Sequence, residues 1–153
     1  LFLRKNFVLV LSGVTDVGNI GALVRSAYAL GVEAIIACGV KQLAFDGITR
    51  SSTGALFDMP FAIEPNIHDV LNDFKMSGFT TYGADMSGKD VRDVKVQDKR
   101  VLVLGSEGEG LSARVISKLD QVLSIKMTHE FDSLNVSVAG AILMDRMRME
   151  GNE

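Results

Sequence analysis

Continuous apolar runs and helical stripes alternate along this chain. The runs Asn6–Leu11 and Arg100–Leu104 are apolar at nearly every position, which is typical of strands buried on both faces of a parallel sheet. Elsewhere, as in Ile20–Leu30 and Ile67–Phe74, apolar residues recur three or four positions apart, which predicts amphipathic helices. Strands therefore alternate with helices, and the pattern predicts an α/β fold with a mostly parallel sheet flanked by helices.

The other expected elements are shorter. We expect further strands at 34–37, 60–63, 79–83 and 121–125, and short helices at 49–56, with Arg50 exposed, and at 112–118. The first helix should begin near Asn19 and stop at Gly31, because glycine is favoured just after a last helical turn. Residues 86–99 are polar and charged, so we expect a surface loop there. The length of 153 residues predicts a single domain spanning 1–153.

The segment 123–149 is unlike the rest of the chain. It predicts a short strand, a loop and a helix that opens at Ser133. Apolar residues fill most positions from Leu134 to Met144, so this helix should be buried both against the sheet and against another surface, such as a second copy of the chain. Free N–H groups at a helix start bind carboxylates and phosphates, which predicts a ligand there; the alternative is that Ser133 is simply an N-cap.

Composition limits the possible binding partners and the cellular compartment. The net charge of −3 gives no overall attraction to nucleic acid, so such binding requires a local basic patch or a further domain. Cys38 is the single cysteine, which excludes an internal disulfide and favours a reducing, cytoplasmic compartment. The sequence shows no signal peptide, membrane-spanning run or metal-binding motif, so we expect neither a membrane nor a metal as a partner.

Four loops rich in polar residues and glycine should meet at the carboxyl edge of the sheet, where α/β folds bind ligands: 12–19, 84–89, 105–111 and 126–133. Two weak motifs lie in them. Gly83–Lys89 nearly matches a phosphate-binding loop, but Asp90 replaces the hydroxyl that binds Mg²⁺, which argues against a nucleotide triphosphatase. Gly105–Gly110 partly imitates a dinucleotide fingerprint, but Glu107 and Glu109 would repel a pyrophosphate. The segment Gly105–Gly110 is equally well explained as a plain tight turn. As a function for the chain, an NAD-dependent oxidoreductase is only a distant alternative.

Three segments together resemble the motifs of the SpoU, or TrmH-type, RNA ribose 2′-O-methyltransferases. They are Asp16–Ala27, Leu102–Ser112, and the pair Ile125–Met127 with Ser133–Ala139. They occur in the family's order and spacing and cover nearly the whole chain. Val17 and Lys126 stand where the family usually has proline, a residue that stiffens loops, so the departures bear on loop geometry.

The resemblance implies a fold of the SPOUT superfamily, in which the C-terminal part of the parallel sheet forms a deep trefoil knot, and it implies a homodimer. It also implies S-adenosylmethionine as the cofactor, with contacts at Leu104, Gly105, Ile125, Met127 and Leu134. The catalytic residues implied are Arg25, Asn19, Glu107, Ser133 and Asn135.

Arg25 has two readings from the sequence alone, a solvated surface arginine or a guanidinium that grips a phosphate or carboxylate. The resemblance implies that Arg25 contacts the target phosphate and helps to deprotonate the 2′-hydroxyl. Because a guanidinium holds its proton too tightly to be a good base, we expect Arg25 to orient the phosphate and stabilise the developing alkoxide instead. Asn19, Glu107, Ser133 and Asn135 would then hold Arg25 and shape the site.

The expected function is therefore S-adenosylmethionine-dependent 2′-O-methylation of RNA, with a guanosine of 23S ribosomal RNA favoured by the segment Ser51–Ala55. A transfer RNA 2′-O-methyltransferase of the same family is one alternative, and a non-catalytic module that binds RNA or cofactor is another. Members usually carry an amino-terminal RNA-binding domain, which we expect to be absent or removed here. RNA binding by this chain should then be weak and sensitive to salt.

Overall fold

The structure is a computed structural model that describes the chain except for residues 1, 41–42, 44, 53, 130–133 and 150–153. The described residues include six parallel strands in the order β3-β2-β1-β5-β4-β6. Their bounds are β1 Phe7–Ser12, β2 Ala34–Cys38, β3 Phe61–Glu64, β4 Thr80–Asp90, β5 Arg100–Gly105 and β6 Gln121–Ser124. The prediction of a parallel α/β sheet is confirmed.

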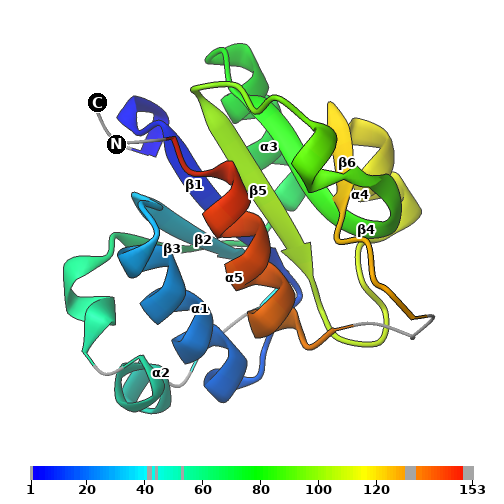
Figure 1. The fold of residues 1–153 in the computed structure, drawn as a ribbon. Helices are drawn as coiled ribbons and strands as arrows, with labels where there is room; N and C mark the ends of the chain where they lie inside the picture. The colour runs from blue at the N-terminus through cyan, green and yellow to red at the C-terminus, as the bar shows by residue number, and fades with distance from the viewer. Residues whose placement is uncertain (1, 41–42, 44, 53, 130–133, 150–153) are drawn as a thin grey trace.

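Helices cover both faces of this sheet (Figure 1). One face carries α1 (Val17–Ala29), α2 (Phe45–Ser51) and α5 (Val136–Met147), and the other carries α3 (Ile67–Met76) and α4 (Ala113–Lys118). The described residues also form three short 3₁₀ turns: η1 (Phe2–Arg4), η2 (Ala55–Asp58) and η3 (Val91–Asp93). None of the described helices combines the length and apolar character needed to cross a membrane.

The central strand shows why its sequence is apolar throughout. Phe7, Leu9 and Leu11 of β1 join the core beneath α1 and α5. Val8 and Val10 join the separate core beneath α3 and α4. Successive side chains of a strand point to opposite faces, so a strand covered on both sides must be apolar at every position.

Helix α5 packs on the sheet as expected. Leu143 and Met144 are fully buried in the core that it shares with α1. Its outer side remains apolar, since Val138 is 48% exposed and Ala141 and Ile142 are only partly buried. The structure therefore accounts for one of the two buried sides that the sequence predicts.

Several predicted boundaries are wrong. Residues 86–90 belong to β4 rather than to a surface loop, because β4 pairs with β6 a second time after a bulge, with Asp90 opposite Ser124. Helix α1 begins at Val17, two residues before Asn19, because Asp16 caps it. The helix predicted at 49–56 instead spans Phe45–Ser51 and is followed by η2.

Thr81 connects β4 to the chain that enters β6. This threonine is fully buried, and its Oγ1 donates to Asp120 Oδ2 over 3.0 Å and accepts from the Asp120 N–H over 3.0 Å. The same carboxylate oxygen accepts from the Thr81 N–H over 2.7 Å. The pair therefore fixes the turn between α4 and β6 against β4.

We expect Thr81→Val, which keeps the side-chain shape but removes the hydroxyl, to lower the free energy of unfolding by about 1–2 kcal/mol. Urea denaturation monitored by circular dichroism measures this change. The matched control is Thr80→Val on the same strand, which lacks these bonds. Equal losses in the two variants would mean that the Asp120 contact contributes nothing specific.

Candidate active site

The first part of the site is the opening turn of α1. Asp16 caps this helix, and its Oδ1 accepts a hydrogen bond of 2.9 Å from the Asn19 N–H. Carboxylates favour this position because they satisfy free N–H groups at a helix start. Asn19 therefore lies in the first turn, at the carboxyl edge of the sheet beyond β1.

The second part is the turn after β5. Ser106 and Gly110 form an antiparallel bridge, in which the Gly110 N–H donates to the Ser106 carbonyl over 2.8 Å. Gly108 and Gly110 have φ values of 83° and 65°, a region that glycine adopts without strain. The segment is thus the tight turn that the sequence left as an alternative to a dinucleotide fingerprint, and it holds Glu107 toward α1 and α5.

The third part is the start of α5. Asn135 caps the helix, since its Oδ1 accepts from the Ser137 N–H over 2.8 Å. The prediction that the helix opens at Ser133 is wrong, because the described helix begins at Val136; Ser133 itself lies outside the described residues. The amide group of Asn135 can cap because it accepts at Oδ1 while its Nδ2 remains free to donate elsewhere.

These three parts meet in one hydrogen-bonded cluster, which we call the edge triad: Asn19, Glu107 and Asn135. Glu107 Oε1 accepts from Asn135 Nδ2, from Asn19 Nδ2 over 3.3 Å and from the Val136 N–H over 3.4 Å. Asn135 Nδ2 also donates to Asn19 Oδ1 over 3.2 Å. The carboxylate lies at the positive end of α5, where a negative charge is stabilised. Two of the loops predicted to meet at this edge, 12–19 and 105–111, do so, and the start of α5 joins them.

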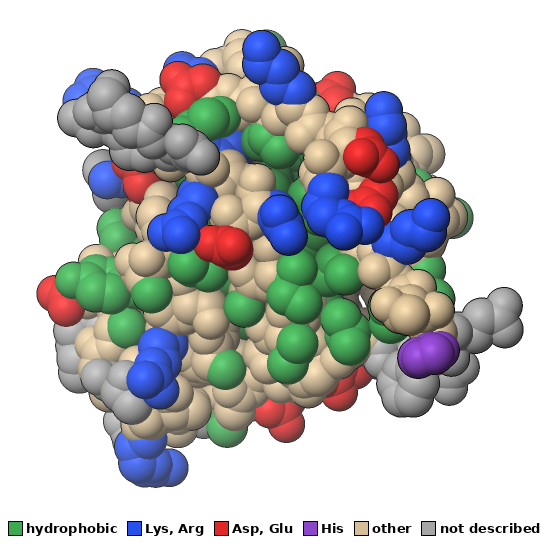
Figure 2. All heavy atoms as spheres, in the orientation of Figure 1, with side chains coloured by type: hydrophobic (Ala, Val, Ile, Leu, Met, Phe, Trp, Pro, Cys, Tyr) green, Lys and Arg blue, Asp and Glu red, His purple; other side chains and the backbone are tan. Residues whose placement is uncertain are grey.

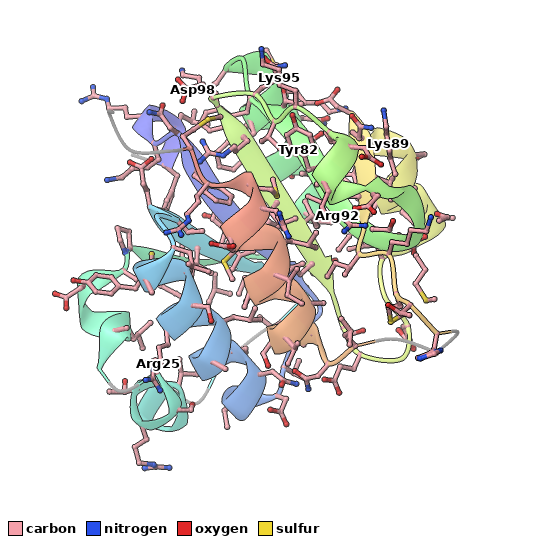
Figure 3. The ribbon with its side chains drawn as sticks, viewed as in Figure 1. Arg25, Tyr82, Lys89, Arg92, Lys95 and Asp98 are labelled. Atoms are coloured by element: carbon pink, nitrogen blue, oxygen red, sulfur yellow. The ribbon has the colours of Figure 1, made fainter. Side chains whose placement is uncertain are left out.

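Arg25 lies apart from the edge triad. It is exposed on α1, six residues after Asn19, so it is about 9 Å further along the axis and on a different side of the helix. Figure 3 shows it beside α2, on the flank of α1 away from α5. The structure thus brings together three of the five predicted catalytic residues, Asn19, Glu107 and Asn135, but not Arg25 within the same chain.

The predicted cofactor residues surround the same edge. Leu104 is buried at the end of β5, and Ile125, Met127 and Leu134 are partly buried in the chain between β6 and α5. Within the part of the chain that the structure describes, the backbone of 125–127 is in neither a helix nor a strand and forms no backbone hydrogen bond. Its N–H and C=O groups are therefore available to a ligand.

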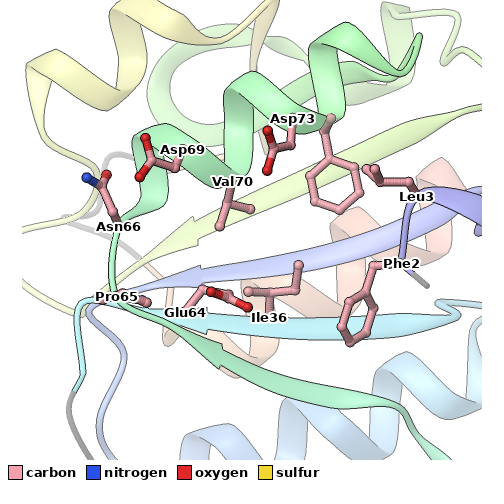
Figure 4. A pocket seen from close by; sticks show the side chains of 10 residues that line it. Phe2, Leu3, Ile36, Glu64, Pro65, Asn66, Asp69, Val70 and Asp73 are labelled. Atoms are coloured by element: carbon pink, nitrogen blue, oxygen red, sulfur yellow. The ribbon is translucent and has the colours of Figure 1, made fainter.

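Two cavities of the described structure lie elsewhere. One, of about 250 Å³, lies between η1, β2 and α3, and Glu64, Asp69 and Asp73 line part of it (Figure 4). Another lies at the amino ends of the strands, near Arg100 and Arg148. Neither contains a predicted site residue, so the edge triad, rather than a cavity, marks the candidate site.

An ion pair that was not predicted lies beside the loop 125–127. Arg92 donates to Asp90 through Nε and through a terminal nitrogen, the closest contact being 2.9 Å. The Arg92 guanidinium holds the pKa of Asp90 below its usual value, and nearby Lys126 lowers it further. The missed signal was two opposite charges two residues apart, directly after a glycine and a lysine.

Comparison with known proteins points to one family. The profile of the SpoU rRNA Methylase family matches residues 6–145. The 23S rRNA (guanosine(2553)-2'-O)-methyltransferase RlmP of Bacillus subtilis is 32% identical over 143 residues, which cover 92% of this chain and 57% of that protein. The 23S rRNA (guanosine-2'-O-)-methyltransferase RlmB of Neisseria meningitidis is 32% identical over 145 residues, or 94% of this chain and 58% of that protein.

Solved structures give the same result. The SpoU methyltransferase AviRb of Streptomyces viridochromogenes, in complex with the cofactor AdoMet, superposes with a TM-score of 0.84 at 31% identity, covering 94% of this chain and 57% of that one. The AdoMet-bound rRNA methyltransferase of Sinorhizobium meliloti has a TM-score of 0.85 at 26% identity, covering 93% and 55%. This chain thus spans little more than half the length of these proteins.

Proposed function

Because this chain belongs to the SpoU rRNA Methylase family, we propose that it is the catalytic part of an S-adenosylmethionine-dependent RNA ribose 2′-O-methyltransferase. The edge triad carries the proposal. Asn19, Glu107 and Asn135 come from three separate motifs of the chain, and their hydrogen bonds join those motifs at the edge of the sheet where α/β folds bind ligands.

The residues at this edge fit S-adenosylmethionine. Free backbone N–H and C=O groups of 125–127 can pair with the edge of an adenine ring, and the side chains of Leu104, Met127 and Leu134 are apolar. Gly105 contributes backbone without a side chain. When bound, the cofactor supplies an electrophilic methyl group on a sulfonium that leaves readily.

The chain's own residues would position the acceptor. The edge triad holds the start of α5 and the 105–110 turn in one geometry, which keeps the loops that flank the cofactor at a constant separation. We assign Arg25 to the phosphate of the target nucleotide, where its charge stabilises the alkoxide that forms on the 2′-oxygen. Ser133 is assigned to the same site from the motif alone.

Two further features of the family are proposed with it. A homodimer would cover the apolar outer side of α5, where Val138 is 48% exposed. A trefoil knot at the carboxyl-terminal end is proposed from the family membership alone. The proposed location is the cytoplasm.

The target we propose is a guanosine of 23S ribosomal RNA, because the two named relatives carry that substrate in their names. A transfer RNA target remains the alternative within the family. A module that binds without turnover is the alternative outside it, and the six-residue separation of Arg25 from Asn19 along α1, on another side of the helix, is the observation in its favour.

The test combines binding with turnover. Calorimetry with S-adenosylmethionine, and separately with NAD, should give micromolar binding of the first and no signal with the second. Transfer of a labelled methyl group to 23S ribosomal RNA transcripts, with transfer RNA transcripts in parallel, identifies the acceptor. Failure to bind S-adenosylmethionine would overturn the proposal, and binding without transfer to any RNA would favour the binding module.

We expect Arg25→Ala to lower methyl transfer by about 10²-fold or more, as loss of a group that stabilises developing charge does, while cofactor affinity stays within about twofold. The matched control is Arg50→Ala, which removes another exposed arginine from the neighbouring helix α2. Equal effects of the two substitutions on transfer would remove Arg25 from the site.

A further inference from the structure

Four exposed cations gather on the face of the molecule that carries α5. They are Lys89 at the end of β4, Arg92 in η3, Lys126 after β6 and Arg146 in the last turn of α5, and we call them the basic band. Figure 2 shows Lys and Arg side chains across this face, with Asp and Glu side chains among them, above an apolar area over α5. Figure 3, in the same orientation, places Lys89 and Arg92 there.

Strand pairing and helix packing bring these cations together from distant parts of the sequence. Asp90 lies opposite Ser124 in the sheet, so the chain leaving β4 toward Arg92 runs beside the chain leaving β6 toward Lys126. The electrostatic effect of Lys126 on Asp90 is a sign of the same proximity. Helix α5 packs against η3, so Arg146 and Arg92 lie on two elements that are in contact.

The band is positive in a chain whose net charge is −3. Arg92 is paired with Asp90, yet 57% of its side chain remains exposed whereas only 12% of the Asp90 side chain does. In the described part of the structure, Lys89, Lys126 and Arg146 have no ion pair within 4.0 Å. Three cations without a carboxylate partner, and one with its partner largely covered, present positive charge to solvent.

We propose that the basic band binds the phosphate backbone of the RNA substrate and leads it to the cofactor loop. This inference rests on the proposed function. Lys126 lies between Ile125 and Met127, so the band reaches the residues assigned to S-adenosylmethionine. A polyanion that follows the band therefore arrives at the site, which favours a nucleic acid over an acidic protein or a lipid surface.

The experiment compares two triple variants with the same change in net charge. The band variant is Lys89→Gln with Arg92→Gln and Arg146→Gln, and it leaves Lys126 in place because that residue adjoins the cofactor loop. The control variant is Arg4→Gln with Lys75→Gln and Arg114→Gln, which removes exposed cations on η1, α3 and α4. Fluorescence anisotropy with a labelled RNA stem-loop of mixed sequence, over a series of KCl concentrations, gives the Kd.

We expect the band variant to raise the Kd roughly tenfold or more at low salt and to reduce the slope of log affinity against log salt by about 2, since each lost phosphate contact removes roughly 0.7–0.9. The control variant should keep the slope of the unmodified chain. Equal slopes for both variants, whether reduced or unchanged, would overturn the proposal.

Further measurements separate this proposal from its rivals. S-adenosylmethionine binding by both variants should equal that of the unmodified chain, so loss of RNA affinity alone leaves the proposed function intact. If the unmodified chain binds no cofactor, the proposed function fails while the RNA slopes still decide the role of the band. Band-dependent binding to phosphatidylserine vesicles without an RNA effect, or a changed oligomeric state of the band variant alone by sedimentation, would overturn the proposal.

Discussion

Replacing Gly105 with alanine is expected to abolish measurable S-adenosylmethionine binding and to lower the free energy of unfolding by about 3 kcal/mol, as overpacking of a rigid site does. A Cβ at this position would lie 2.3 Å from the Gly110 carbonyl carbon and 2.5 Å from its oxygen. These are backbone atoms, so the turn must open rather than a side chain rotate away. Opening it would move Glu107 from its hydrogen bonds with Asn19 and Asn135. Calorimetry and guanidinium denaturation measure the two effects.

The control for this prediction is Gly47→Ala on α2. A Cβ at Gly47 would meet the nearest Val17 methyl carbon at 3.2 Å, a side-chain contact that a small shift relieves. This variant should bind cofactor like the unmodified chain. If Gly105→Ala also bound cofactor normally, the 105–110 turn would not form part of the cofactor site.

Arg100→Met should lower the free energy of unfolding by about 3 kcal/mol, because it leaves a buried helix end without its donor. Arg100 is only 4% exposed, and its Nε donates to the carbonyl of Met147, the last residue of α5, over 2.8 Å. A terminal nitrogen donates to the Asp98 carbonyl, and the guanidinium lies 4.1 Å from the centre of the Phe7 ring. Burial lowers the pKa of this guanidinium, while nearby Asp98 raises it.

Urea denaturation measures the free energy of unfolding of Arg100→Met, with Lys99→Met as the control variant. Lys99 is exposed and lies 5.4 Å from the Phe79 ring, a surface contact that contributes at most about 1 kcal/mol. A similar small decrease in the free energy of unfolding of both variants would show that the contact of Arg100 with α5 is dispensable. A large loss for Arg100→Met alone identifies β5 as the anchor for the end of this helix.

The strands were predictable where burial alone determines the residue types. β1 and β5 are covered on both faces, and their runs of apolar residues give their positions within one residue. The end of β4 was not predictable, because Ser87 and Lys89 have no apolar periodicity and the strand is held by backbone pairing with β6. The Ser124 hydroxyl donates to the Gly88 carbonyl over 2.8 Å, a contact for which the sequence carries no sign.

The site was predictable only in part. The helix start at α5 was located within three residues, but the residue that caps it was not, since Ser133 and Asn135 both suit a cap by residue type. The meeting of the loops followed from parallel strands. The separation of Arg25 from Asn19 follows from counting residues on α1, but which neighbouring element Arg25 would lie against depends on α2, whose position the periodicity misplaced.

The pairing at the centre of the sheet has a consequence for synthesis on the ribosome. β1 pairs with β5, and Phe7 lies opposite Arg100. Strand β1 therefore has only β2 as a neighbour until β5 has been synthesised. The apolar strands β1 and β2 also lack the cover of α5 until residues 136–147 have been synthesised. Contacts between residues so far apart in the sequence slow folding and prolong the exposure of hydrophobic, aggregation-prone segments. A growing chain of this protein should therefore be a client of ribosome-associated chaperones until helix α5 emerges.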